Sequence, residues 1–170
     1  MTSTTEVALG LQCQSRVVRL PQGDLEVYEA CDGPPPAFLR GAFTDYTVWA
    51  ITSAPLVPLG YRGVVPALPL GSHRLPMPRR ADLSPPGLRD LVAELIMALE
   101  LAPATIVSND TGTAIMQLVL TRRPDTVAAA VLTSGDAYEH FLLPTLATLK
   151  ALPYIPGGLQ ILSRVMRHPT

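Results

Sequence analysis

The sequence has little charge, few cysteines and no long hydrophobic run. Only 16% of its 170 residues are charged, against about 25% in an average soluble domain, yet 48% are hydrophobic, so a disordered chain is excluded. No apolar run reaches the roughly 18 residues of a membrane helix. The first residues also lack the basic stretch of a signal peptide. We therefore expect a cytoplasmic protein that does not enter a membrane.

The sequence also lacks the marks of metal, nucleotide and nucleic-acid binding. Its two cysteines, Cys13 and Cys31, have neither metal nor redox spacing, so we expect no metal and no cofactor. Thirteen basic against fourteen acidic residues leave a net charge of −1 and no basic stripe, which excludes electrostatic binding of nucleic acid. Neither a dinucleotide-binding glycine motif nor a phosphate-binding loop is present. The partner that remains is a small-molecule substrate.

Proline is abundant instead, with 18 residues spread along the chain, and it marks the boundaries of short elements. The hydrophobic pattern predicts a leading β-hairpin and then strands alternating with helices, so we predict an α/β fold whose sheet is mostly parallel, with helices on both faces. The predicted strands are 16–20, 24–30, 37–39, 61–65, 104–107 and a buried last strand, 127–133, and the predicted helices are 46–58, 84–101 and 111–123.

The most informative segment follows the strand 104–107. Its residues run Ser108-Asn109-Asp110-Thr111-Gly112, a small–x–Asp–x–Gly pattern between a buried strand and an amphipathic helix. A sharp strand-to-helix turn exposes its central side chain and needs small residues two positions before and after it. Asp110 could then be a carboxylate nucleophile that forms an ester. Aspartate is equally a preferred N-cap, so Asp110 could instead only cap the helix.

Several segments, taken in order, resemble the α/β-hydrolase fold family, and most closely its branch with an aspartate nucleophile, the haloalkane dehalogenase and epoxide hydrolase-like proteins. A further segment, 132–141, resembles the start of that family's cap. The resemblance implies a core over 1–138 and the beginning of a helical cap over 139–170. The core segments that carry it are Phe38-Leu39-Arg40-Gly41-Ala42-Phe43, Gly60-Tyr61-Arg62-Gly63-Val64-Val65-Pro66, Ala81-Asp82-Leu83-Ser84-Pro85 and Val107-Ser108-Asn109-Asp110-Thr111-Gly112.

The resemblance assigns roles to individual positions. It makes Asp110 the nucleophile and the backbone N–H groups of Ala42 and Thr111 the oxyanion donors. Asp136 is a candidate for the second acid. The family's general base is a histidine after the final strand, and none of His73, His140 and His168 occupies such a position. The implied activity is hydrolysis of a small ester, epoxide or halide through an ester on Asp110.

Two departures from the family pattern bear on that activity. Arg40 stands where the family usually has histidine, and Thr111 stands where the dehalogenases and epoxide hydrolases usually have tryptophan, so a halide loses one N–H donor. We expect the 170 residues to correspond to the front portion of the family fold, without its last strands and histidine loop. The alternative function is therefore a truncated, non-catalytic relative that at most binds a ligand or partner. The apolar segment 139–168 also predicts self-association through an exposed sheet edge.

Overall fold

The computed structural model describes residues 3–8, 11–30, 33–135, 155–158, 160 and 164. The chain divides into two compact units, Met1–Gly135 and Asp136–Thr170. In the second unit the N–H of Gly158 donates to the carbonyl of Ile155 at 2.9 Å, closing a turn. The candidate site lies in the first unit, which is described below.

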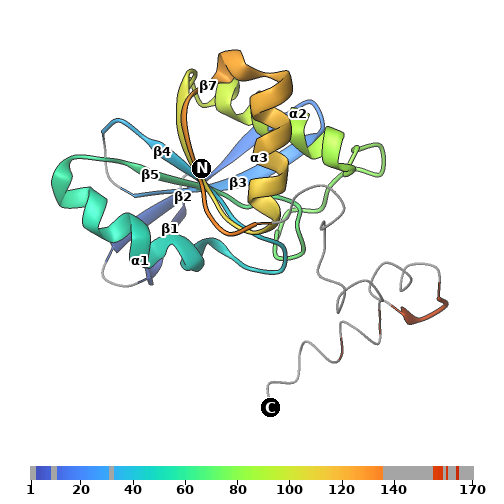
Figure 1. Cartoon of the computed structure of the whole chain (residues 1–170). Helices are drawn as coiled ribbons and strands as arrows, with labels where there is room; N and C mark the ends of the chain where they lie inside the picture. The colour runs from blue at the N-terminus through green and yellow to red at the C-terminus, as the bar shows by residue number, and fades with distance from the viewer. Residues whose placement is uncertain are drawn as a thin grey trace. The chain divides into compact units, whose positions relative to one another are not determined.

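Seven strands of the first unit form one sheet in the order β1-β2-β3-β5-β4-β6-β7 (Figure 1). The pairs β1–β2, β2–β3 and β3–β5 are antiparallel, whereas β5–β4, β4–β6 and β6–β7 are parallel. The sheet is therefore mixed, with the predicted leading hairpin at one end and a parallel part of four strands at the other. The strands are β1 (Ser3–Ala8), β2 (Leu11–Leu20), β3 (Gly23–Ala30), β4 (Pro36–Leu39), β5 (Gly63–Pro66), β6 (Ala104–Ser108) and β7 (Val127–Leu132).

The antiparallel end of the sheet is larger than the sequence predicts. The strand β1 was not predicted, and β2 begins at Leu11 and not at residue 16. These residues are mostly polar, and the only alternation among them, Leu11-Gln12-Cys13-Gln14, is too short to give a clear strand signal. They become strands because β1 pairs with β2 and β2 pairs with β3 along the sheet.

Two long helices cover one face of the sheet, α2 (Pro85–Ala98) and α3 (Thr111–Arg122). Their apolar side chains join those of β2 to β6 in the larger core, which includes Leu25, Leu91, Ile106 and Met116. The start of α2 follows the predicted signal, because the Ser84 hydroxyl accepts the N–H of Gly87 at 3.3 Å.

The opposite face carries the shorter helical turns η1 (Tyr46–Trp49), α1 (Ala50–Ser53) and η2 (Ala54–Leu59), as Figure 1 shows. A continuous helix over 46–58 was predicted, but only one α-helical turn forms between two 3₁₀ segments. Pro55 and Pro58 cannot donate a backbone N–H, which prevents a regular α-helix here. A second core lies under this segment and contains Tyr28, Phe38 and Trp49. Helical elements thus cover both faces, as predicted.

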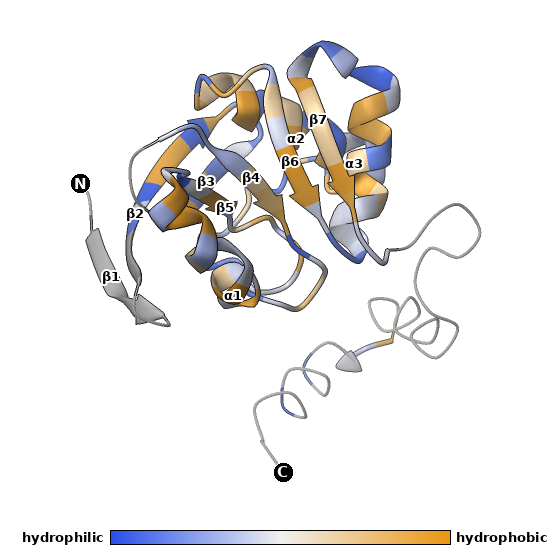
Figure 2. Cartoon of the chain, turned by 60° about the vertical axis from the view of Figure 1, so that its left-hand side comes forward, coloured by the Kyte–Doolittle hydropathy of each residue, from blue (hydrophilic) through white to orange (hydrophobic). Residues whose placement is uncertain are grey.

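The last strand, β7, lies at one edge of the sheet in the part of the chain that the structure describes. It was predicted to be buried, and this prediction is wrong for the first unit: Val131 is 49% exposed and Leu132 is 43% exposed. Figure 2 shows the apolar character of this strand. β7 follows the short turn η3 (Pro124–Thr126). It is exposed because it pairs only with β6, whereas each central strand has a neighbour on both sides.

No helix in the described ranges is both long enough and apolar enough to cross a membrane.

The close packing of α3 on the sheet depends on Gly112. A β-carbon at this position would lie 2.6 Å from the carbonyl oxygen of Leu39 and 2.8 Å from that of Arg40. We predict that Gly112→Ala lowers the free energy of unfolding by about 1–3 kcal/mol, because backbone atoms must move to admit the methyl group. Chemical denaturation measures this loss. The exposed Thr121→Ala on the same helix is the control and should change stability by less than about 0.5 kcal/mol; equal effects would contradict the packing argument.

The exposed edge strand generates a second prediction. β7 presents unpaired backbone groups and apolar side chains without charge or proline, which are the features that favour edge-to-edge association. We expect the chain to self-associate at high concentration in light scattering and Val131→Lys to reduce this association. Ile51→Lys, which adds the same charge at a 74% exposed position elsewhere, is the control. A monomer at high concentration, or an equal effect of the two substitutions, would contradict the prediction.

Candidate functional site

The turn between β6 and α3 holds Asp110 in an unusual backbone conformation. Its φ is 49° and its ψ is −130°. A positive φ is uncommon for any residue except glycine and carries strain of about 1–3 kcal/mol. Backbone hydrogen bonds hold the turn, because the N–H of Asp110 donates to the carbonyl of Ser134 at 2.7 Å and the N–H of Asn109 donates to that of Leu39 at 3.1 Å.

Small residues flank Asp110 on both sides where the backbones approach. Ser108, two positions before, is fully buried, and its hydroxyl accepts a hydrogen bond from the Thr113 hydroxyl at 3.2 Å. Gly112, two positions after, faces the end of β4 so closely that only glycine fits. The strand-to-helix turn therefore passes within van der Waals contact of the loop that follows β4.

The side chain of Asp110 does not cap the helix. Asp110 occupies the N-cap position of α3, but its carboxylate makes no capping hydrogen bond. The residue is exposed, and the carboxylate lies against the backbone of Gly41, where a β-carbon would collide with it. The positive φ turns this carboxylate away from the helix N–H groups and towards the loop after β4. The capping interpretation therefore does not describe the geometry of this turn.

Two backbone N–H groups beside Asp110 have no acceptor among the described residues. Thr111 is the first residue of α3, where the backbone N–H has no partner within the helix. Ala42 lies in the loop after β4. Within residues 33–135 no hydrogen-bond acceptor is found for either N–H group. Thr111 follows Asp110 in the sequence. Ala42 follows Gly41, which contacts the Asp110 carboxylate.

Arg40 fixes the loop that carries Gly41 and Ala42. Its side chain is only 1% exposed, and its guanidinium donates to the carbonyl of Gly41 at 3.2 Å and to that of Leu68 at 2.6 Å. The loop is also tied to the segment after β5, because the N–H of Phe43 donates to the carbonyl of Leu70 at 2.8 Å. Arg40 therefore joins the two loops, in a position where the family resemblance predicted histidine.

The site lies where the chain changes direction across the sheet. After β4 the chain moves to β5 on one side, and after β6 it moves to β7 on the other side. Gly41 follows the carboxyl end of β4, and Asp110 follows the carboxyl end of β6. In open α/β sheets this crevice between oppositely directed connections is where ligands bind.

Other predicted residues lie outside the site or outside the described residues. Asp136, the candidate second acid, and His140 and His168 fall outside the described ranges. His73 is described, and its Nδ1 is buried without a hydrogen-bond partner. Burial and the nearby positive charge of Arg40 both lower its pKa, which favours the neutral imidazole. No described contact joins His73 to Asp110.

The sequence did not single out Gly41 as a neighbour of Asp110, because the two residues are 69 positions apart and meet only in the sheet. No group of three or more His, Cys, Asp or Glu side chains that could hold a metal ion occurs in the described part of the chain. The site thus consists of a carboxylate, two unpaired backbone donors and a loop held by Arg40.

Solved structures match this chain, whereas no protein-family model and no curated protein matches it. An epoxide hydrolase from Vigna radiata is 23% identical, with a TM-score of 0.70, and the match covers 88% of this chain and 52% of that protein. The haloalkane dehalogenase DatA from Agrobacterium tumefaciens C58 is 24% identical, with a TM-score of 0.70, and the match covers 92% and 54%. A naproxen esterase from Bacillus subtilis is 16% identical, with a TM-score of 0.70, and the match covers 90% and 54%.

The chain spans about half the length of these three proteins. What the matches show is a shared fold. The chain therefore has the α/β-hydrolase fold, over the part of that fold that it spans.

Proposed function

We propose that this chain carries the nucleophile of a hydrolase, and that Asp110 attacks the substrate to form a covalent ester. The observation that carries the proposal is the backbone of Asp110, at φ 49° and ψ −130°, with a carboxylate that is exposed and makes no capping bond. A strained conformation persists only where the surrounding structure enforces it, and such residues cluster at functional sites. The proposal applies to a small-molecule substrate with an electrophilic carbon.

The chemistry of the first step follows from the carboxylate. With an epoxide, one Asp110 oxygen bonds to a ring carbon, the carbon–oxygen bond of the ring breaks, and the released alkoxide takes a proton from water. The carboxylate makes no hydrogen bond to α3, but the positive end of that helix's dipole still favours its negative charge before the attack. A small ester or halide is also within the proposed substrate class, but Thr111 offers no side-chain N–H to a departing halide. An epoxide, which has no separate leaving group, is therefore the first substrate to test.

The second step hydrolyses the ester. Water attacks the carbonyl carbon of the Asp110 ester, and negative charge develops on the carbonyl oxygen. The bond between that carbon and the substrate oxygen then breaks, and the substrate oxygen takes one proton of the attacking water, which releases the diol. The other proton neutralises the hydroxide left by the first step, and Asp110 is again a carboxylate. We assign the N–H groups of Ala42 and Thr111 as donors to that oxygen, since both lack other acceptors in the described chain. Arg40 acts as a positioning residue, because it fixes the loop that presents Ala42.

The alternative candidate is a non-catalytic relative that binds a small ligand without turnover. The observation that favours it is that no described contact joins a histidine to Asp110, so the residue that would activate the water in the second step is not identified. The two candidates differ in the first step, because only the hydrolase forms a bond to Asp110. A covalent adduct therefore separates them even when turnover is slow.

The substitution Asp110→Ala tests the nucleophile directly. Incubation of the chain with 1,2-epoxyhexane should add the full mass of the epoxide to the peptide that contains Asp110, or should release the diol, as measured by mass spectrometry. We predict that Asp110→Ala lowers the rate of both by about 10³-fold or more. Asp125→Ala, which removes an exposed carboxylate, is the matched control and should leave the rate unchanged. An unmodified Asp110 together with no diol would contradict the hydrolase and leave the binding candidate.

The contact between Gly41 and Asp110 generates a further prediction. In Gly41→Ala the new methyl group would displace the Asp110 carboxylate. We predict a fall in the rate of ester formation by about 100-fold, since displacement by about 1 Å can cost that much. Gly60→Ala is the control: at a φ of 85° the substitution strains the backbone, but its new methyl group meets no atom within 4 Å and lies outside the site, so the rate of ester formation should not change. A Gly41→Ala variant that remains folded by circular dichroism and reacts at the original rate would refute this geometry.

A further inference from the structure

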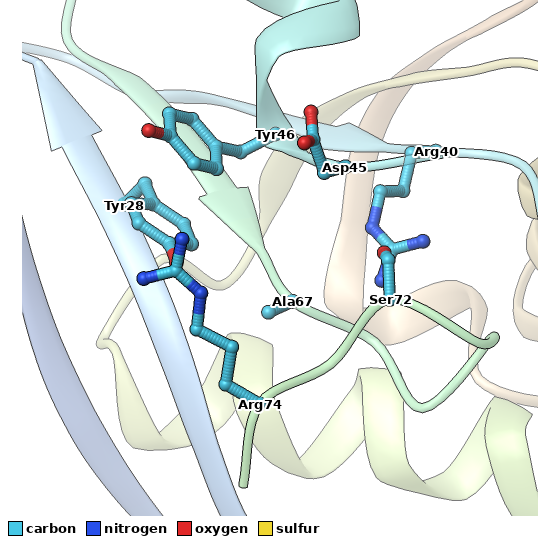
Figure 3. Close-up of a pocket in the computed structure, with 7 residues that line it drawn as sticks. All are labelled: Tyr28, Arg40, Asp45, Tyr46, Ala67, Ser72 and Arg74. Atoms are coloured by element: carbon cyan, nitrogen blue, oxygen red, sulfur yellow. The ribbon is translucent and has the colours of Figure 1, made fainter. Parts of the chain in front are cut away.

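A cavity lies beside the loop that carries Gly41, and Asp110 is not among the residues that line it. Its volume is about 80 Å³, several times the roughly 10–15 Å³ that one water molecule needs. It opens at the carboxyl ends of β4 and β5, the edge of the sheet where α/β proteins bind ligands. Figure 3 shows the side chains around it, which are Tyr28, Arg40, Asp45, Tyr46, Ala67, Ser72 and Arg74.

One wall of the cavity is the guanidinium of Arg40. This side chain is 1% exposed, and within residues 33–135 its hydrogen bonds go to two neutral carbonyl groups, those of Gly41 and Leu68. It takes part in no ion pair there. A guanidinium has five N–H donors, so three remain beyond these two bonds. Burial lowers the pKa of Arg40, which is the electrostatic cost of burying its charge, and the carboxylate of Asp45 offsets part of that cost.

The opposite wall is aromatic and carries a second guanidinium. The rings of Tyr28 and Tyr46 stack with their centroids 3.9 Å apart and their planes at 14°. Figure 3 shows Arg74 extending along Tyr28 on the same side of the cavity. Burial, and then Glu26, raise the pKa of Tyr28, so its phenol stays protonated and uncharged. The wall therefore combines a flat apolar surface with an exposed positive charge.

The net charge of the side chains that line the cavity favours a ligand with a single negative charge. Two guanidinium groups against the single carboxylate of Asp45 leave one net positive charge around the cavity. The Oδ1 atom of Asp45 already accepts the N–H of Thr47 at 2.9 Å and also the Thr47 hydroxyl, as the cap of η1. A ligand with one negative charge neutralises this lining, whereas a dianion exceeds it. A planar carboxylate also matches the two parallel donors of a guanidinium.

We propose that this cavity binds the carboxylate of a small aromatic acid, with Arg40 as its buried counterion and the Tyr28–Tyr46 pair as the surface on which its ring packs. Arg74 closes the cavity from the solvent side and adds a second, weaker charge contact. The site is separate from Asp110, so its binding is measured without any turnover. Arg40 also holds the loop that presents Ala42, so Tyr46→Ala and Arg74→Gln, which leave Arg40 in place, test this proposal separately from the proposed function.

Calorimetric titration of the whole chain with benzoate tests the proposal. We expect saturable binding of one benzoate per chain, and weaker binding of acetate, which has no ring to pack on the tyrosines. The substitution Arg74→Gln should weaken benzoate binding about two- to fivefold, because an exposed charge contact is partly screened. Arg79→Gln removes an exposed arginine from the same connection between β5 and α2 that does not line the cavity. This control should leave the affinity unchanged.

Two further variants and a second anion test the role of Arg40 and the charge of the ligand. Arg40→Met should weaken benzoate binding more than about tenfold. Tyr46→Ala tests the proposal even if the Arg40→Met protein does not fold. The Tyr46→Ala substitution should weaken the binding of benzoate but not that of acetate. Inorganic phosphate serves as the dianion. The absence of saturable benzoate binding, tighter binding of phosphate than of benzoate, or equal effects of Arg74→Gln and Arg79→Gln would each overturn the proposal.

Discussion

The backbone conformation of Asp110 is the constraint on which the candidate site depends. A φ of 49° in a residue with a β-carbon persists only because its neighbours leave no other path for the chain. The N–H of Asp110 is fixed to Ser134, and Gly112 brings α3 against the end of β4. These contacts join three strands at their carboxyl ends. The strain at Asp110 is offset by their packing, and the result is a carboxylate that faces Gly41 and not its own helix.

The same packing explains how the buried charge of Arg40 contributes both to the Asp110 site and to the cavity beside the tyrosine pair. Arg40 lies behind the loop that faces Asp110, and its hydrogen bonds to Gly41 and Leu68 hold that loop against the segment after β5. The Arg40 side chain also lines the cavity beside the tyrosine pair. A histidine could hold the loop with less buried charge. The arginine in this chain creates a positively charged cavity that a neutral side chain would not create.

The sequence predicted those parts of the fold whose signals are local. Ser84 and Pro85 mark the start of α2, and the small residues around Asp110 mark the sharp turn, because each signal depends on neighbours within a few positions. The strand β1 and the exposure of β7 were not predicted, since both depend on which strands pair in the sheet. The part that Arg40 plays was also not predicted, because its acceptor Leu68 lies 28 positions away in sequence.

The unfolding free energy of Asp110→Gly tests the central claim most directly. If Asp110 is strained and its side chain makes no cap, glycine relieves the strain without loss of a hydrogen bond, and the free energy of unfolding should rise by about 1 kcal/mol. If the carboxylate caps α3 in solution, the substitution removes the cap, and stability should fall by a few tenths of a kcal/mol. Chemical denaturation of the two proteins side by side gives the sign. An increase supports a strained nucleophile turn, and a decrease contradicts it.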